Sequence, residues 1–221
     1  MEQAGKRLLA FPLFQGMSND ELTSVLAHTK FGFVKYPEGK RIIKAGEACR
    51  HLLFLTHGKL KVTTSSISPN FSVEETITAP TIIQPECLFG LPQRFRSTFV
   101  ALEPVNLITL DKKEVLSLCS KFLAFQLNLF NFMSAKCQRA LLDPWDNHPA
   151  TLRQHVANFL IRHCQMPTGK KIFNILMRQL ANEINDSRLD VSKTLNEMEE
   201  EGLLILSRGK ITVPAIERII E

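Results

Sequence analysis

The 221-residue sequence lacks the features that define several common classes of protein. Its five cysteines are scattered and form no CxxC pair, which disfavours a disulfide framework or a zinc ribbon and predicts a reducing compartment, the cytoplasm. No stretch approaches the roughly 18 consecutive apolar residues of a membrane span. The first residues also lack the apolar core and cleavage site of a secretory signal. We therefore exclude collagen, a coiled-coil rod, a membrane protein and a disulfide-rich mini-protein.

Motifs of enzymes and metal centres are also missing. The sequence contains no Ser/His/Asp order, P-loop, HExxH or GxSxG motif. The cysteines form no cluster near the N-terminus that could hold an iron–sulfur centre. His155, His163 and Cys164 share one predicted helix, where packing explains them better than a metal or haem site. We expect a protein that is not an enzyme, with no catalytic residue and no metal.

The sequence does contain enough apolar material for a packed core, because 44% of its residues are hydrophobic and 22% are charged. A chain of this length forms one large domain or two modest ones. Its net charge of +5 permits an anionic partner such as nucleic acid without proving one. Evidence for such a partner must therefore come from where particular side chains are placed.

The N-terminal half has the pattern of a small β-structure preceded by a helix. Residues 18–30 predict a short helix, with Ser18 as its N-cap and Glu21 at the capping-box position. From 31 to 110, short apolar runs alternate with Gly, Pro, Ser and Asn. This spacing favours many short antiparallel strands in a barrel or roll. We predict an α+β fold whose sensor domain covers residues 1–110.

Residues 111–142 change to a helical period. Apolar side chains recur alternately three and four residues apart from Val115 to Phe132, as in an a/d seam. We expect a dimerisation helix whose seam meets a second copy, while its other face covers the sheet. The predicted seam consists of Leu118, Phe122, Phe125, Leu129 and Phe132. The second flank consists of Leu116, Leu123, Leu127 and Phe130. The alternative is that this helix is buried inside one monomer.

The segment DPWDNHP, residues 143–149, interrupts the helical pattern with two prolines and several polar residues. We predict a hinge there and a second domain over residues 150–221. That domain begins with a helix at 151–165, whose apolar residues recur at helical spacing.

Residues 177–203 have the pattern of two helices joined by a tight turn. Leu180 and Ile184 are four residues apart, and the small Ala181 lets a second helix cross closely. Asn185 tolerates the left-handed backbone that such a turn requires. Ser187 is the N-cap of the second helix.

The second predicted helix covers residues 187–201, with Asp190 at its capping-box position and Gly202 at its end. Its inward stripe consists of Val191, Leu195 and Met198. Two short strands around Arg208-Gly209 follow, which completes the layout of a winged helix-turn-helix. The alternative is an ordinary helical hairpin with a solvated charged face.

The exposed first turns of this recognition helix would face a major groove. Arg188 and Lys193 could donate to guanine O6 and N7, and Leu189 could contact a thymine methyl group. The candidate DNA-binding residues are Ser187, Arg188, Leu189, Ser192, Lys193 and Arg208.

The order of roll, long helix, hinge and winged helix-turn-helix resembles the bacterial cyclic-AMP receptor protein / fumarate-nitrate reductase regulator (Crp/Fnr) family. The segment LANEINDSRLDVSKTLNEMEEEGLL is similar to that family's helix-turn-helix signature in length and in nearly every apolar position. The resemblance covers essentially the whole chain. It implies an N-terminal cyclic-nucleotide-binding-like roll, a cytoplasmic homodimer, and double-stranded DNA and RNA polymerase as partners.

The resemblance places base contacts on Arg188, Leu189 and Lys193, and a phosphate contact on Ser187. Leu189 stands where the family usually has a glutamate. A glutamate accepts a hydrogen bond from cytosine N4, which leucine cannot do, so the family's usual half-site sequence is not expected.

In the same family, a Gly-Glu pair and an Arg-Ser pair ten residues later hold the phosphate and ribose of a cyclic nucleotide. The matching candidates here are Glu86, Arg96, Ser97 and Thr98. Pro85 occupies the glycine position and Thr81 an earlier glycine position, so the turn loses a backbone N–H donor and its freedom to approach a ligand. We expect no cofactor. We also expect that cyclic AMP is not the effector, and that the roll binds either another anionic molecule or no ligand. Alternatively, Glu86 and Arg96 form only a salt bridge.

Together these patterns predict a homodimeric DNA-binding transcription regulator that reads a two-fold symmetric site through helix 187–201. The alternative is a cyclic-nucleotide-type signalling module that acts on a protein partner without binding DNA. A winged helix-turn-helix discriminates between them, because such modules lack one.

Overall fold

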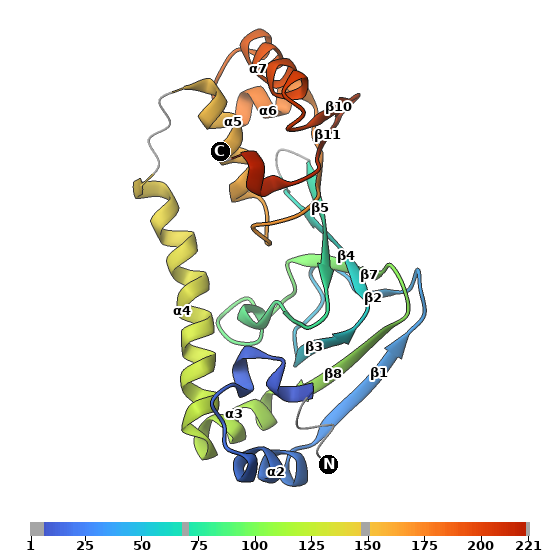
Figure 1. Ribbon diagram of the computed structural model, residues 1–221, viewed down its shortest axis with the longest axis vertical. Coiled ribbons are helices and arrows are strands. Elements are labelled where there is room, and N and C mark those ends of the chain that lie inside the picture. Colours follow the sequence, from blue (N-terminus) through green and yellow to red (C-terminus); the bar gives the residue numbers. More distant parts are fainter. Residues whose placement is uncertain (1–6, 68–70, 147–150, 220–221) are drawn as a thin grey trace. The chain divides into compact units, whose positions relative to one another are not determined.

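The computed structural model describes residues 7–67, 71–146 and 151–219 (Figure 1). The chain forms two compact units, and it passes between them after Leu60, Ile77 and Leu142. Unit 1 comprises residues 1–60 and 78–142, and unit 2 comprises residues 61–77 and 143–221. The predicted domains 1–110 and 150–221 stay predictions, but the grouping of residues 61–77 with the C-terminal part was not expected.

Unit 1 begins with two short helical segments. They are η1 (Pro12–Phe14) and α2 (Asn19–His28). The N-cap predicted for α2 is confirmed, because the Ser18 hydroxyl oxygen accepts from the Glu21 backbone N–H at 3.2 Å. The Glu21 carboxylate accepts from the Ser18 N–H at 2.8 Å, which completes the capping box.

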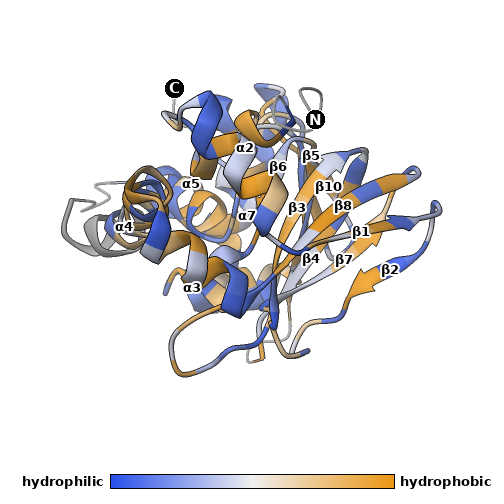
Figure 2. Cartoon of the chain, turned by 90° about the horizontal axis from the view of Figure 1, so that it is seen from below, coloured by the Kyte–Doolittle hydropathy of each residue, from blue (hydrophilic) through white to orange (hydrophobic). Residues whose placement is uncertain are grey.

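The strands of unit 1 form the expected roll. They are β1 (Phe31–Tyr36), β2 (Arg41–Ile43), β3 (His51–His57), β6 (Thr81–Ile83), β7 (Ser97–Ala101) and β8 (Val105–Asp111). One sheet has the order β1-β8-β3-β6, with antiparallel pairs, and β2 pairs with β7. The central strand β3 is buried from Leu52 to Leu55. A 3-10 turn, η2 (Pro85–Cys87), separates β6 from β7. Figure 2 shows hydrophobic residues along these strands and along the helices that follow.

The single helix predicted over 111–142 is wrong. The structure has α3 (Lys112–Lys121) and α4 (Leu123–Asp146), whose axes are bent by 118° at Phe122. Phe122 has an extended backbone, and its N–H closes α3 by donating to the Leu118 carbonyl. No single helix among the described residues is long and apolar enough to cross a membrane; only this bent pair passes by length and composition.

Burial within unit 1 corrects the predicted dimer seam at three of its five positions. Leu118, Phe125 and Leu129 are buried there, whereas Phe122 and Phe132 are half-buried. The Phe125 ring lies 5.3 Å from the Phe14 ring, between centroids. The Asn128 amide donates to the carbonyls of Leu13 and Gln15, which fixes this side of α4 against the N-terminal segment. The side chains that remain exposed are those of the other flank, Leu116, Leu123, Leu127 and Phe130.

The hinge predicted over residues 143–149 was placed to begin before the helix ends. Helix α4 continues to Asp146, past Pro144. Proline removes one N–H donor from a helix, but this loss does not end the helix here. The rest of the predicted hinge, residues 147–150, lies outside the described residues.

Unit 2 contains a hairpin from the N-terminal half and the whole described C-terminal part. Its elements are β4 (Lys59–Ser65), which begins in unit 1, β5 (Ser72–Thr78), which ends there, α5 (Leu152–Arg162), β9 (Lys171–Asn174), α6 (Met177–Glu183), α7 (Arg188–Glu200), β10 (Ile205–Ser207), β11 (Lys210–Val213) and η3 (Ile216–Ile219). The strands follow the order β10-β11-β9-β5-β4. Strand β5 therefore extends the sheet of the wing, a pairing that the sequence did not predict.

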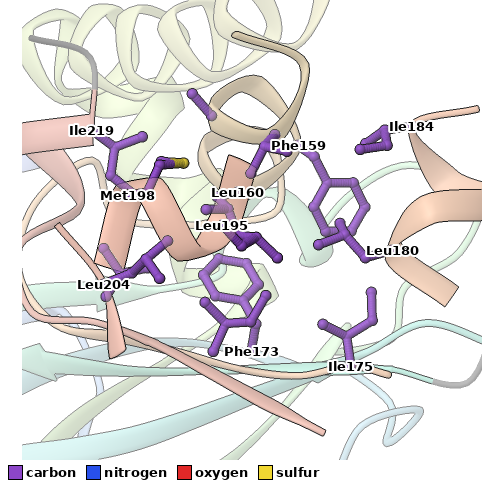
Figure 3. Close-up of a cluster of buried hydrophobic side chains, with 14 of the residues drawn as sticks. Phe159, Leu160, Phe173, Ile175, Leu180, Ile184, Leu195, Met198, Leu204 and Ile219 are labelled. Atoms are coloured by element: carbon purple, nitrogen blue, oxygen red, sulfur yellow. The ribbon is translucent and has the colours of Figure 1, made fainter. Parts of the chain in front are cut away.

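A single apolar core holds unit 2 together. Side chains from α5, α6 and α7 converge on those of the strands, as Figure 3 shows for Phe159, Leu160, Phe173, Leu180 and Leu195. Phe71 and Val73 of the hairpin segment belong to the same core. The hairpin is thus packed into this unit through its apolar side chains as well as its backbone.

Candidate nucleic-acid interface

The turn between α6 and α7 has the geometry predicted for it. Asn185 adopts a left-handed backbone, with φ of 55°. The Asp186 N–H donates to the carbonyl of Ala181, which is buried, at 3.0 Å. These contacts set the start of α7 directly after the turn, as a helix-turn-helix requires.

The N-cap of α7 is also confirmed, but its capping box differs from the expected one. The Ser187 hydroxyl oxygen accepts from the Asp190 N–H at 3.1 Å, and the hydroxyl donates to the Asp190 carboxylate at 2.6 Å. The Ser187 N–H donates instead to the carboxylate of Asp186, at 2.7 Å. Two carboxylates therefore take both donors of Ser187, the residue expected to contact a phosphate.

Helix α7 buries one face and exposes the other. Val191, Leu195 and Met198 are inaccessible to solvent, as predicted from their spacing. On the opposite side Arg188 and Lys193 are exposed, Leu189 is 83% exposed and Ser192 is half-buried. A large apolar side chain this exposed in the first turn of a helix is suited to contact with a partner surface.

The cations of this face, Arg188 and Lys193, are exposed. Within the described part of the chain, neither Arg188 nor Lys193 forms a salt bridge. Their donors are therefore free to bind base edges or phosphates.

The wing presents Arg208 at its tip. Strands β10 and β11 pair from Ile205↔Thr212 to Ser207↔Lys210, so the turn consists of Arg208 and Gly209. Gly209 has a positive φ of 69°, which only glycine adopts freely. Lys210, which the sequence analysis did not single out, is also exposed beside Arg208.

The acidic end of α7 fixes the recognition helix within its unit. Glu199 accepts from the N–H of Leu206, at 2.6 Å, which ties the helix to the wing. Arg153 of α5 forms two hydrogen bonds with the Glu201 carboxylate. Hydrogen bonding to Arg153 lowers the pKa of Glu201, and the same bond raises the pKa of Arg153.

The structure does not bring the four candidate ligand-binding residues of the roll together into one open anion site. They are Glu86, Arg96, Ser97 and Thr98. Arg96 is exposed, Ser97 is fully buried, and Thr98 is half-buried, its hydroxyl accepting from the Ala45 N–H at 3.1 Å. The salt bridge between Glu86 and Arg96 is not formed. Instead, Glu86 pairs with Lys136 of α4 at 2.7 Å.

Gln84, which the sequence analysis missed, occupies the centre of this turn. It is buried and has a left-handed backbone, with φ of 38°. Its amide nitrogen donates to the Ser97 hydroxyl at 3.0 Å, and its amide oxygen accepts from the Arg96 N–H at 3.0 Å. In the sequence Gln84 is only a polar residue two positions before Glu86, and its burial appears only in the folded chain.

His163 and Cys164 take part in packing. The His163 ring lies 4.3 Å from that of Phe159, and the Cys164 thiol donates to the Leu160 carbonyl. Burial raises the pKa of Cys164 to about 12, so its thiol stays protonated and unreactive at neutral pH. Among the described residues no group of His, Cys, Asp or Glu has the arrangement of a metal site.

Comparison with known proteins agrees with this architecture. The model of the cyclic nucleotide-binding domain matches residues 33–122, and that of the Crp-like helix-turn-helix domain matches residues 154–221. A Thermus thermophilus protein named cyclic AMP receptor protein is 27% identical over 207 residues, covering 91% of this chain and 92% of its own.

Two solved structures show the shared fold. The catabolite activator protein of Thermus thermophilus aligns over 96% of this chain and 97% of its own, with 24% identity and a TM-score of 0.54. The sensor domain of the regulator DNR from Pseudomonas aeruginosa aligns over 68% of this chain and 96% of its own, with 18% identity and a TM-score of 0.52.

A cyclic-nucleotide-binding roll joined to a Crp-like helix-turn-helix defines a DNA-binding transcription regulator. The alternative of a signalling module without DNA binding has no support, because the helix-turn-helix is present. The chain belongs to the Crp/Fnr family of transcription regulators.

Proposed function

We propose that the protein acts as a homodimer that reads a two-fold symmetric DNA site through α7. The observation that carries this proposal is the exposed start of α7, where Leu189 is 83% exposed and neither Arg188 nor Lys193 forms a salt bridge with any described residue. Arg208 and Lys210 of the wing add positive charge for the phosphate backbone.

Selection from a pool of random double-stranded DNA tests the proposal. We expect the recovered site to be two-fold symmetric, with half-sites about 34 Å, one helical turn, apart. Arg188→Ala or Lys193→Ala should weaken binding to that site by about 1–3 kcal/mol. Lys35→Ala removes an equally exposed cation from β1 of the roll and should leave affinity unchanged. Equal affinity for all sequences would refute specific reading.

The second copy is proposed to pack on the exposed flank of α3 and α4. Leu116, Leu123, Leu127 and Phe130 are each at least half exposed and lie on the side that does not cover the roll. Leu123, Leu127 and Phe130 recur at helical spacing on one face of α4, and exposed apolar side chains on one helix face favour an isologous contact in a two-fold dimer.

We propose that cyclic AMP is not the effector of this chain, although a relative carries it in its name. Pro85 has no N–H to offer, and Gln84 already uses the Ser97 hydroxyl and the Arg96 N–H. A nucleotide would also have to displace Lys136 from Glu86 or bind beside that pair. The roll therefore takes either no effector or a different anion that contacts the exposed Arg96 guanidinium.

Calorimetry with cyclic AMP, cyclic GMP and a set of small anions tests this view. We expect no binding of cyclic AMP at micromolar concentration. Micromolar binding that disappears in Arg96→Ala would overturn the proposal, because it would mean that the nucleotide displaces Gln84.

Three broader proposals follow from the family. The protein is proposed to act in the cytoplasm, to have no enzymatic activity, and to contact RNA polymerase at the promoters it binds. Co-purification of RNA polymerase with the DNA-bound protein, compared with protein bound to DNA without a promoter, tests the last of these.

A further inference from the structure

Unit 2 contains a buried ion pair that takes no part in the proposed contacts with DNA. Lys171 Nζ lies 2.8 Å from Glu75 Oε1, and both side chains are 1% exposed. The Glu75 carboxylate also accepts from the backbone N–H groups of Gln165, at 2.9 Å, and Met166, at 3.0 Å. Three donors from the C-terminal part of the chain therefore converge on one carboxylate from β5.

Strand pairing and side-chain hydrogen bonds hold the rest of the hairpin in the same place. Strand β5 pairs with β9 from Ser72↔Asn174 to Glu75↔Lys171. The Asn174 amide donates to the Ser72 hydroxyl at 3.3 Å and to the Glu74 carboxylate at 3.0 Å.

Apolar packing adds to these polar contacts. The Phe71 ring lies 5.6 Å from that of Phe159 and 5.2 Å from that of His163, both on or next to α5. Phe71 and Val73 share their core with Val191 and Leu195 of the recognition helix. The described residues of the hairpin, 61–67 and 71–77, thus contact the DNA-binding unit through strand pairing, side-chain hydrogen bonds and apolar packing.

The chain connects this hairpin to the roll at both ends. Residues 61–77 are preceded by Leu60 and followed by Thr78, which belong to unit 1. The hairpin is therefore covalently continuous with the roll and non-covalently part of the DNA-binding unit. Because removing one partner of a buried ion pair leaves an uncompensated charge, docking of the hairpin depends on Glu75 and Lys171 together.

We propose that the hairpin 61–77 is a lock that fixes the DNA-binding unit to the roll, with Glu75 and Lys171 as positioning residues for DNA binding. This inference rests on the proposed function, in which two α7 helices must meet the two halves of one site. A docked hairpin restricts each DNA-binding unit before DNA arrives, so less freedom is lost when both half-sites are engaged. A single half-site needs no such alignment.

The test measures affinity for the selected two-fold site and for DNA that carries one half-site. Glu75→Gln keeps the shape of the side chain and removes the charge that Lys171 needs. We expect it to weaken binding to the two-fold site about tenfold and to leave half-site binding unchanged. The matched control is Glu38→Gln, which removes the charge of an exposed carboxylate in unit 1, outside the hairpin, and should leave both affinities unchanged.

A cross-link provides a rescue that a merely damaged fold would not show. Ser72 and Asn174 are opposite each other and in contact, so Ser72→Cys with Asn174→Cys places two thiols across β5 and β9. These changes are added to Glu75→Gln together with Cys137→Ser, which removes an exposed thiol. Oxidation should restore the affinity for the two-fold site, and reduction should remove it again.

The outcomes separate the lock from the proposed function. A wild-type protein that prefers the two-fold site no more than one half-site would refute the proposed function. The lock itself is overturned if Glu75→Gln keeps the wild-type preference or binds the two-fold site more tightly. Equal losses at both DNAs, or no recovery on oxidation, would also overturn it, because the hairpin would then act only on the folding of unit 2.

Discussion

Leu127→Glu and Phe125→Ala separate the two faces of α4. Leu127 is 50% exposed in the single chain, whereas Phe125 is fully buried against Phe14. Replacing an exposed side chain changes the stability of a protomer by no more than about 0.5 kcal/mol. Truncating a buried phenylalanine costs about 3–5 kcal/mol, so Phe125→Ala should lower the unfolding midpoint strongly.

The effect of Leu127→Glu on the dimer follows from its surroundings in the proposed interface. Each protomer loses about 1 kcal/mol of apolar burial, since half of the side chain is still exposed before association. Burying a carboxylate without a partner costs about a further 1–3 kcal/mol in each protomer. Because the change occurs in both protomers, the dimer should weaken by about 4–8 kcal/mol, or roughly a thousandfold or more in its dissociation constant.

Sedimentation of the two variants, together with chemical unfolding, measures both quantities. We expect Leu127→Glu to be a folded monomer that has lost tight binding to the two-fold DNA site. A Leu127→Glu variant that remains a dimer at micromolar concentration would refute the assignment of this face. A wild-type protein that is already monomeric there would refute dimerisation through either face.

Three further outcomes are expected. Gln84→Ala should destabilise the roll by about 1–3 kcal/mol in chemical unfolding, because it removes the two hydrogen bonds that the Gln84 amide makes with the Ser97 hydroxyl and the Arg96 N–H; an unchanged stability would contradict that role. Since the pKa of Glu201 is lowered in the folded state, its pairing with Arg153 stabilises the protein above the carboxylate's ordinary pKa and is lost as pH falls through the lowered value. The stability difference between wild type and Arg153→Met should therefore disappear in acid, and a difference that persists would argue against the pairing. Thiol reagents at pH 8 should modify the exposed Cys137 well before Cys164, whose pKa is about 12, and mass spectrometry of partly labelled protein measures the order.

Local interactions explain the parts that could be predicted from the sequence. Each of these interactions involves residues only a few positions apart, so a short stretch of sequence is enough to predict it. They are the N-caps at Ser18 and Ser187 and the left-handed turn at Asn185. The inward stripe of α7 follows from its helical period in the same way. These elements sufficed to predict the winged helix-turn-helix, and the resemblance of the whole order of elements to a known family indicated the family.

Tertiary structure decided the features that depend on contacts between distant residues. The apolar period of α4 identified two faces, but packing against Phe14 determined which of them is buried. Glu75 and Lys171 are 96 residues apart, and Gln84 contacts a hydroxyl 13 residues away across a turn. The residues adjacent to Glu75 or Gln84 in the sequence do not indicate which distant residue each will contact. The free energy of these contacts arises only when folding removes both groups from water. The sequence by itself therefore determined which kind of regulator this is, and the tertiary structure decided which distant residues hold the roll together and which hold the DNA-binding unit together.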